Sequence, residues 1–342
     1  MGEDNRLNRL SEMGDPLKKV ASAVGFEIFR PIWNEIFSYQ TYAKGKGGRK
    51  PWDYVRMFKI LLLQEWNNIA DDHTEYLIND RLSYQRFLGL SLGDKVPDAK
   101  TIWAFREALT KSGRTKELFG LFAKLMEEQG VITRRGSIVD AAFSDAPRQR
   151  NGREENETIK AGKTPEDWER PEQKAKRRQK DTDARWAKKN GEVHFGYKNH
   201  IKADRDSKMI VDYAVTTASV HDSQVAADLI DRKDKYVHMD SAYSGEPVER
   251  AIREKNKSVR LSVQQKSNRG HPLTNRQRAA NRKRSKIRSR VEHIFGHMRM
   301  SMGGLNVRCI GIARASVIIG LKNLAYNISR LAILKKQQLV PA

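Results

Sequence analysis

The chain has 342 residues, 38% of them hydrophobic, which suits a globular protein with one large domain and a smaller one. Lys and Arg number 65 against 42 acids, a formal net charge of +23 that attracts polyanions, nucleic acid above all. A well-solvated or ribosome-associated basic protein is the alternative. The single cysteine, Cys309, excludes a disulfide framework and a cysteine-rich zinc site. No secretory signal or membrane-length apolar run of roughly 18–20 residues is apparent, so we expect an intracellular protein.

The first part of the chain is predicted to be helical. Residues 1–48 form an expected N-terminal arm, with one helical piece near 26–37 and a flexible basic run at 44–50. Residues 49–132 form an expected helical DNA-binding or dimerisation domain. Its predicted helices begin near Pro51 and after the N-cap Asp98, and span 115–129 before Gly130. A helix-turn-helix DNA reader and an ordinary dimerising bundle are about equally consistent with this pattern.

After residue 133 the pattern favours a mixed sheet flanked by helices. Short β-type runs and helices alternate here. The strands are expected at 137–143, 193–201, 209–216, 236–239 and 259–263, and the helices at 221–231, 287–300 and 313–336. The second and third strands are expected to form a hairpin. A charged insert, residues 148–190, is predicted to be a long loop or a solvated helix.

Two aspartates occupy strand positions suited to binding a metal ion. Asp140 interrupts an apolar strand, where a buried carboxylate is costly unless it is paired or coordinated. Asp240 directly follows the strand expected at 236–239, and α/β proteins often bind ligands at such strand ends. By themselves, an Asp on the wet face of an edge strand and a turn-initiating Asp explain the two positions as well.

Glu292 lies on a helix with one apolar stripe. At about 100° per residue, Arg288, Glu292 and Arg299 fall within roughly 40° of one another beside that stripe. A carboxylate framed by arginines can face a metal ion while the arginines hold phosphates. A surface ion pair between Arg288 and Glu292 is the plainer explanation, and on these residues alone it is preferred.

Basic residues crowd the same region without any acid among them. A solvated tail is the alternative, but the run continues into an amphipathic helix, which favours a phosphate-binding surface. The eight residues are Arg276, Arg278, Arg282, Lys283, Arg284, Lys286, Arg288 and Arg290.

Ordered motifs over nearly the whole length resemble bacterial insertion-sequence transposases of family five, which carry a DDE catalytic domain on an RNase H-like fold. In the first half the motifs are Phe29–Pro31, Met57–Leu63, Asp80–Ser83, Arg86–Leu90, Val96–Asp98 and Thr101–Trp103. In the second half they are Ile138–Ala141, Phe195–Lys198, His200–Ile201, Thr216–Ala218, His221–Asp222, Asp240–Tyr243 with Gly245, and Arg290–His293. The implied catalytic domain spans 133–336.

The resemblance implies that Asp140, Asp240 and Glu292 are the DDE triad, which would be both catalytic and metal-binding. The family signature places a tyrosine seven residues before the glutamate, an arginine four before it and a lysine seven after it. Arg288 fits, while Ser285 replaces the tyrosine and Arg299 replaces the lysine. The resemblance also points to His221 and His293 as supports of the active site, although His221 would equally well touch DNA.

The implied activity is strand cleavage at transposon ends by metal-activated water, followed by attack of the 3′-hydroxyl on target DNA. It implies two Mg²⁺ ions per active site, with Mn²⁺ as a substitute. The implied partners are double-stranded DNA, as terminal inverted repeats and target, and a second copy in a homodimer or larger oligomer. We expect a cytoplasmic location in bacteria, associated with the nucleoid.

Three other functions remain open on the sequence. A domesticated transposase kept only for DNA binding would not need three acids facing phosphate. An RNase H-type nuclease acting on hybrids or junctions often needs no separate helical domain. A basic scaffold protein is the most remote.

Overall fold

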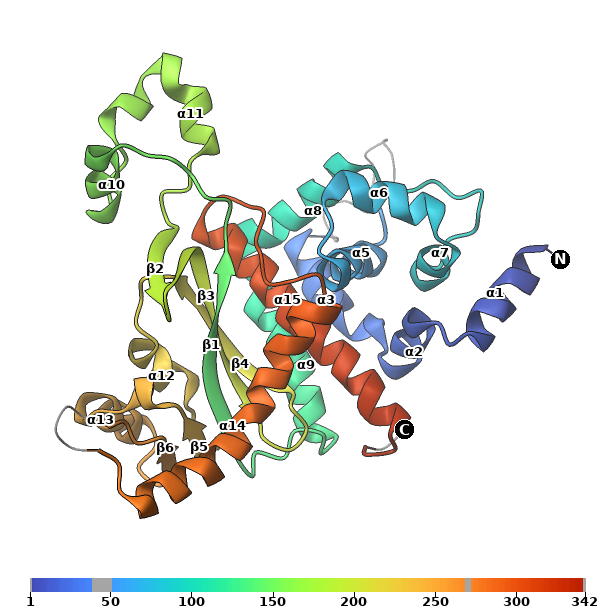
Figure 1. Ribbon diagram of the computed structural model, residues 1–342. Coiled ribbons are helices and arrows are strands. Elements are labelled where there is room, and N and C mark those ends of the chain that lie inside the picture. The colour runs from blue at the N-terminus through green and yellow to red at the C-terminus, as the bar shows by residue number, and fades with distance from the viewer. Residues whose placement is uncertain (1, 39–50, 268–271, 341–342) are drawn as a thin grey trace. The chain divides into compact units, whose positions relative to one another are not determined.

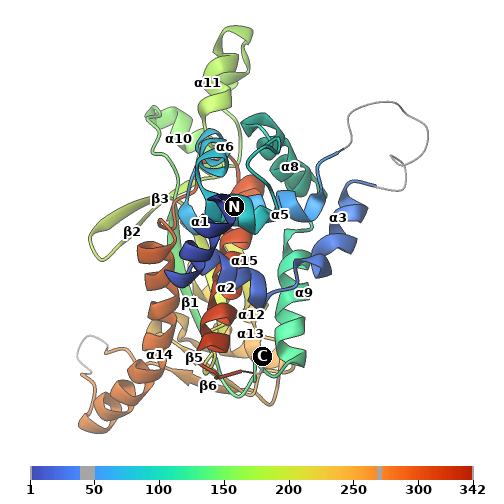
Figure 2. The same cartoon turned by 90° about the vertical axis from the view of Figure 1, so that its right-hand side faces the viewer.

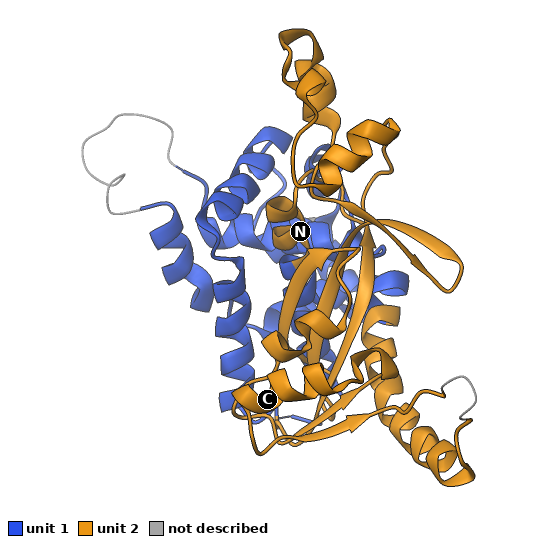
Figure 3. Ribbon diagram, turned by 90° about the vertical axis from the view of Figure 1, so that its left-hand side faces the viewer, with its two compact units in different colours: residues 1–132, 297–304, 320–342 blue, residues 133–296, 305–319 orange. Residues whose placement is uncertain are grey.

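The computed structural model describes residues 2–38, 51–267 and 272–340, and these form two compact units (Figure 3). Unit 1 comprises residues 1–132, 297–304 and 320–342, and unit 2 comprises residues 133–296 and 305–319. The chain therefore passes from one unit to the other four times. The basic run predicted at 44–50 lies outside the described residues.

Unit 1 is helical. Its elements are α1 (Gly2–Glu12), α2 (Pro16–Ala23), η1 (Phe26–Phe29), α3 (Arg30–Ile36), α5 (Tyr54–Asn67), α6 (Asp71–Asp80), α7 (Leu82–Leu88), α8 (Ala99–Ser112) and α9 (Thr115–Glu128). The caps Asp98 and Gly130 are confirmed, because Asp98 accepts the Thr101 amide and Gly130 has a φ of 71°. The prediction for Pro51 was wrong. Helix α5 begins at Tyr54, because the Asp53 carboxylate caps it by accepting the Arg56 amide.

Unit 2 is built on a mixed sheet (Figure 1). Its strands are β1 (Ser137–Asp145), β2 (Arg185–Lys189), β3 (Glu192–Asp204), β4 (Ile210–Thr217), β5 (Tyr236–Met239) and β6 (Arg260–Val263). Strand β3 is antiparallel to β1, β2 and β4, whereas β5 is parallel to β1 and β6. The expected fold class is confirmed: a mixed sheet flanked by helices follows an N-terminal helical region.

The two faces of this sheet are covered by different helices. Val139 on β1 is fully buried in a cluster with Ala226 of α12 (Ser223–Leu229) and Ile252 of α13 (Glu246–Lys255). Side chains alternate along a strand, so Asp140 points to the opposite face. There it meets α14 (Asn275–Ser301), which lies in front of β1 in Figure 1.

The charged insert is folded, contrary to the predicted loop or solvated helix. It contains α10 (Arg153–Lys160), η2 (Glu166–Glu169), η3 (Pro171–Gln173), α11 (Lys174–Gln179) and the strand β2. Trp168 is fully buried, and its indole and the Lys176 ammonium both donate to the Glu155 carboxylate at 2.7 Å. One aromatic core residue and one shared acid thus order a segment that is otherwise polar.

The last helix, α15 (Ile312–Lys336), corrects the expectation about apolar runs. Among the described residues it is long and apolar enough to cross a membrane, with a mean hydropathy of 1.3. However, 72% of that apolar window is buried inside the protein. Lys322 within it is also buried and donates to the Glu65 and Met302 carbonyls. This burial is typical of the core helix of a globular protein.

Candidate active site

Asp140 lies in the middle of β1, on the face opposite the α12–α13 core. Its side chain is 14% exposed, and its Oδ1 accepts the Ala141 amide at 2.9 Å. Burial raises the pKa of this carboxyl, against the lowering effect of the nearby Arg288. Asp240 nearby also raises the pKa. Asp140 is therefore an acid whose charge requires a cation close by.

Asp240 follows β5 directly and is brought level with Asp140 by strand register. Ser137 pairs with Val237 and Ile138 with His238, an offset of 100 residues that, when extended, places residue 240 beside residue 140. Asp240 caps η4 (Ser241–Tyr243), because its Oδ1 accepts the Ala242 amide at 2.5 Å. Two carboxylates on neighbouring parallel strands thus meet at one level.

Arg288 joins the two aspartates. Its Nη2 lies 3.3 Å from Asp140 Oδ2 and 3.9 Å from Asp240 Oδ2, with the arginine side chain 15% exposed. Its Nη1 donates to Gln264 Oε1 at 2.9 Å, and Gln264 Nε2 in turn donates to Ser285 Oγ at 2.7 Å. Ser285, in the position of the family tyrosine, therefore belongs to the chain of contacts that holds Arg288.

Glu292 lies one turn after Arg288 on α14, and its side chain is exposed. Among the described residues no group of three or more His, Cys, Asp or Glu side chains is arranged to hold a metal ion. The structure thus brings Asp140 and Asp240 together through Arg288, and does not gather Glu292 into one cluster with them.

The other basic residues of α14 fall into two groups. Arg282, Lys283 and Lys286 are exposed. Arg284 contacts the Asn281 amide oxygen at 3.3 Å, and Arg290 binds the Arg205 carbonyl and the Asp206 carboxylate. Arg299, also on α14, is exposed but belongs to the segment assigned to unit 1.

The two histidines expected to support the site are both exposed. The Nδ1 atom of His221 lies 2.7 Å from the Ser223 hydroxyl at the start of α12. His293 follows Glu292 on α14. The neighbouring Asp222 is buried at the N-cap position of α12, where its carboxylate forms an ion pair with the Lys198 ammonium at 2.8 Å and makes no cap hydrogen bond.

Tyr243, three residues after Asp240, belongs to the buried cluster that α12 and α13 form with Val139. It is 2% exposed, and no hydrogen-bond partner of its hydroxyl is found within the described ranges. Burial raises its pKa well above the usual value, and the charges of Asp140, Asp222 and Asp240 add to this. The phenol therefore stays neutral.

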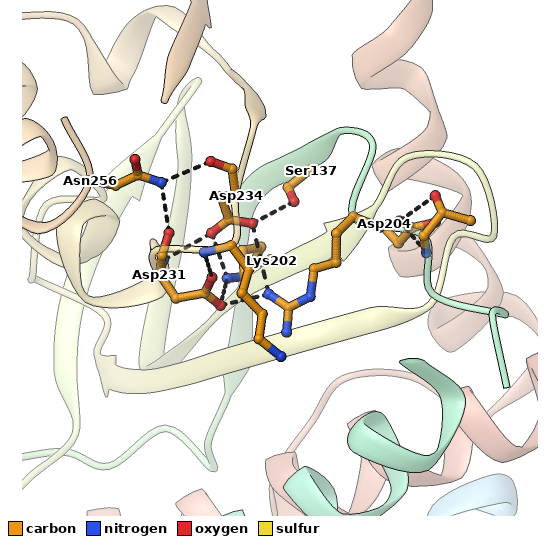
Figure 4. A network of polar contacts seen from close by, with 9 residues as sticks. Ser137, Lys202, Asp204, Asp231, Asp234 and Asn256 are labelled. Carbon is orange, nitrogen blue, oxygen red and sulfur yellow. Dashed lines mark hydrogen bonds and ion pairs between the residues drawn. The ribbon is translucent and has the colours of Figure 1, made fainter. Parts of the chain in front are cut away.

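A buried polar network holds the start of β5 in place (Figure 4). Lys202 on β3 is fully buried, and its ammonium lies 2.8 Å from Asp234 and 2.9 Å from Asp231. Ser137 on β1 donates to Asp234 at 3.0 Å, and Asn256 donates to the carbonyls of both aspartates. The network ties β1 and β3 to the turn before β5, and so supports the register that aligns Asp140 with Asp240. No sequence motif marks it.

Family models match both parts of the chain. The model described as "Transposase DDE domain" matches residues 133–328, more than half of the chain, and the model described as "Transposase domain (DUF772)" matches residues 5–108. The chain belongs to the DDE transposases. A structure titled "Cryo-EM structure of piggyBac transposase synaptic complex with hairpin DNA (SNHP)" aligns with 96% of this chain and 77% of that one, at 10% identity and a TM-score of 0.47.

Family membership identifies the activity. The protein is a DNA transposase, an enzyme of the class that cleaves and transfers DNA strands with divalent metal ions. Asp140 and Asp240 suit such ions, because hard cations prefer carboxylate oxygens and these two carboxylates already share one positive charge. The DDE domain match includes both aspartates, Arg288 and Glu292. This match separates the transposase from the basic scaffold protein.

Proposed function

We propose that Asp140, Asp240 and Glu292 together hold the divalent metal ions of this transposase. The observation that carries the proposal is the contact of one arginine, Arg288, with both aspartates. Because an unpaired buried carboxylate is costly, the site is built for a cation between these two acids. Glu292 lies on the same side of α14 as Arg288, one turn later, and its exposed side chain is free to rotate toward a bound ion.

The finer assignments follow the family. We propose Mg²⁺, replaceable by Mn²⁺, with two ions per site, since paired ions suit in-line displacement at phosphorus. Bound ions of this kind activate a water or a 3′-hydroxyl and stabilise the leaving oxygen. Arg288 gives up its contacts with the aspartates when an ion binds, and its guanidinium then holds a DNA phosphate.

We further propose that the basic residues of α14 hold the DNA backbone beside the acids. The residues are Arg282, Lys283, Arg284, Lys286 and Arg290, with Arg299 in place of the family lysine. His221 and His293 are secondary candidates for the same surface or for orienting the site. The substrates would be terminal inverted repeats and target DNA. A dimer or larger oligomer of this chain, a transposase of family five, would bind them at the bacterial nucleoid.

The test is a set of three isosteric variants, Asp140→Asn, Asp240→Asn and Glu292→Gln. Each is expected to abolish Mg²⁺-dependent nicking of end DNA while leaving DNA binding in EDTA nearly unchanged, because each removes a metal ligand and no DNA contact. Asp228→Asn and Glu249→Gln, exposed acids of unit 2, are matched controls. Full nicking by any triad variant removes that residue from the site.

A further inference from the structure

The β2–β3 hairpin projects from unit 2 beyond the rest of the sheet (Figure 2). Strand β2 pairs only with residues 192–196 of β3, whereas β1 pairs with residues 196–204. Its connection is the two-residue turn Asn190–Gly191, with φ values of 51° and 85° that suit a tight type I′ hairpin. This is a two-stranded arm whose residues 188–193, around the turn, are exposed.

One side of the arm, here called the hairpin face, consists of Arg148, Trp186, Lys188 and Val193. Trp186 pairs with Phe195 and Lys188 with Val193 across the two strands, so these side chains lie on one side. Trp186 is 44% exposed and Val193 is 41% exposed, while Phe195 is buried. Large exposed apolar side chains beside free cations mark a binding surface.

Arg148 is held in place by this face. Its guanidinium lies 5.9 Å from the centre of the Trp186 ring, and its Nη2 donates to the Val193 carbonyl at 2.8 Å. Trp186 in turn packs on Phe195, with ring centres 4.8 Å apart. An arginine fixed in this way keeps most of its five N–H donors free, and it loses little side-chain entropy when it binds an anion.

The charges of the arm are unpaired. Arg148, Lys188 and Lys189 are exposed, and none forms an ion pair with any residue in 2–38, 51–267 or 272–340. Glu192, the acid nearest the tip, pairs across the strands with Lys189 in the ladder and lies 3.8 Å from His194. The hairpin face therefore presents two cations, Arg148 and Lys188, beside the exposed ring of Trp186, whereas Lys189 lies on the opposite side of the arm across from Glu192.

We propose that the β2–β3 hairpin binds duplex DNA, with Arg148 and Lys188 of the hairpin face and Lys189 of the opposite side on backbone phosphates. A two-stranded ribbon fits the major groove, and phosphate contacts fix the position of the protein on the duplex. Trp186 is a positioning residue that supports Arg148. This deepens the proposed function by adding a DNA contact away from the acids. Nine residues of β3 separate the tip from Ile201, the partner of Asp140, or about 30 Å.

The test measures duplex binding by fluorescence anisotropy in EDTA, over a range of salt concentrations. Lys188→Gln with Lys189→Gln is expected to weaken binding several-fold and to reduce the salt slope by up to about 1.8, because each lost phosphate contact removes about 0.9. Arg148→Gln and Trp186→Ala should each reduce it by about 0.9, while Trp186→Phe keeps it. In the hairpin variants, hydroxyl-radical protection of the DNA should be lost about nine base pairs from the cleavage site, because about 30 Å corresponds to about nine pairs at 3.4 Å each.

The matched controls are Lys235→Gln with Lys257→Gln, which remove the same charge elsewhere in unit 2, and Trp103→Ala, a tryptophan that is 50% exposed. An equal loss in these controls overturns the proposal. So does an unchanged slope in the hairpin variants. If the hairpin variants weaken binding only to DNA with unpaired bases, Trp186 stacks on bases. If they change the oligomer size in light scattering and leave DNA binding unchanged, the hairpin face binds a second copy of the chain. Either result overturns duplex binding.

Failure of this proposal is distinguishable from failure of the metal site. The hairpin variants should nick bound DNA at the wild-type rate when the protein is saturating, because they leave the acids intact. The triad variants should bind in EDTA with the wild-type slope.

Discussion

Arg288 acts as an internal counter-charge for two acids that would otherwise repel each other. Two carboxylates at one level of adjacent strands disfavour simultaneous ionisation, and an arginine within 4 Å of both reverses this. The same positive charge competes with any metal ion for the same oxygens. The residue therefore stabilises the site in the folded protein and must yield when the site is used.

Replacing Arg288 by Gln should strengthen divalent-ion binding at pH 8 and make it more sensitive to acid. The pKa of Asp140 is raised by burial, and the arginine lowers it, so its loss raises that pKa further. Metal binding requires the ionised acid, so binding should be lost on acidification at a higher pH than in the wild type. Mn²⁺ titrations from pH 8 to 5 measure both effects.

The control is Arg282→Gln, which changes an exposed arginine of the same helix and should leave unchanged the pH at which Mn²⁺ binding is lost. If Arg288→Gln loses Mn²⁺ binding at the same pH as the wild type, the arginine does not set the charge of Asp140.

His200 predicts a pH dependence of stability. It is fully buried on β3, and burial lowers its pKa to about 4. The unfolded chain, with a pKa near 6.5, binds more protons between these values, so stability is complete above pH 6.5 and is lost as pH falls toward 4. The loss attributable to this group is about 3 kcal/mol, at about 1.4 kcal/mol per unit.

His200→Gln should flatten this slope, because the amide can still contact the Thr216 hydroxyl but cannot titrate. Urea unfolding at pH 7, 5.5 and 4.5 gives the comparison. His73→Gln, an exposed histidine, should keep the wild-type slope. Parallel slopes in His200→Gln and the wild type would contradict the assignment.

At the residue level, the sequence predicted where the acids lie but not what they contact. Asp140 and Asp240 stood out because a carboxylate interrupts or ends an apolar strand. Arg288 was expected to hold phosphates, and its contact with Asp140, 148 positions away, depends on how α14 packs on the sheet. Tyr243 lay within the motif Asp240–Tyr243, but the motif did not predict that its hydroxyl is buried with no hydrogen-bond partner among the described residues.

Among the elements, β3 depends on a single glycine. Gly196 has a φ of 146°, and a Cβ there would lie 2.5 Å from the Ser144 carbonyl oxygen and 2.6 Å from the Ala146 nitrogen. At this point β1 ends, and the Ala146 amide donates to the Phe195 carbonyl at 2.8 Å. The close approach lets the backbone of β3 continue from the body of the sheet into the hairpin.

Gly196→Ala should therefore lower the free energy of unfolding by about 2–4 kcal/mol, from steric overlap and backbone strain combined. Urea denaturation is the measurement. Gly296→Ala is the matched control, because its site in α14 has nothing within 4 Å and alanine favours the helix. Equal stability of the two variants would mean that the backbone at residue 196 adapts without cost.

The elements show why the insert and β2 were missed. The Asn190–Gly191 pair is a strong hairpin signal, and the strand alternation around Trp186 is present but short. The contacts of Trp168 with Glu155 and Lys176 arise from medium-range packing in a polar segment, which hydrophobic periodicity does not detect. The strand β5, by contrast, was predicted with its bounds, because its apolar run ends at a charged residue.

The network around Lys202 shows how buried polar residues can serve the site. A fully buried ion pair adds little net stability, because desolvation offsets the attraction. It does impose a requirement for one arrangement, since removing either partner leaves a buried charge unpaired. Asp231 shows the strength of this arrangement: burial acts to raise its pKa, yet hydrogen bonds from Lys202 and Arg134 lower it to about 2.

At the scale of the whole molecule, the net charge of +23 predicted a polyanionic partner, and the DDE family assigns DNA to that role. The return of residues 297–304 and 320–342 to unit 1 was beyond sequence patterns. It depends on contacts such as the Trp66 indole with the Ala325 carbonyl at 2.9 Å, 259 residues apart within unit 1. Such pairs carry no local signal.

That division determines when unit 1 can finish folding during synthesis. Residues 2–132 leave the ribosome before unit 2, but the helical unit also needs residues 297–304 and 320–342. The partners of the Trp66 indole and the Glu65 carboxylate lie on α15, which is translated after nearly all of unit 2, so these two side chains must wait for it. A nascent chain shortened before residue 320 would leave Trp66 and Glu65 without these partners, which would expose incomplete transposases to cellular proteases.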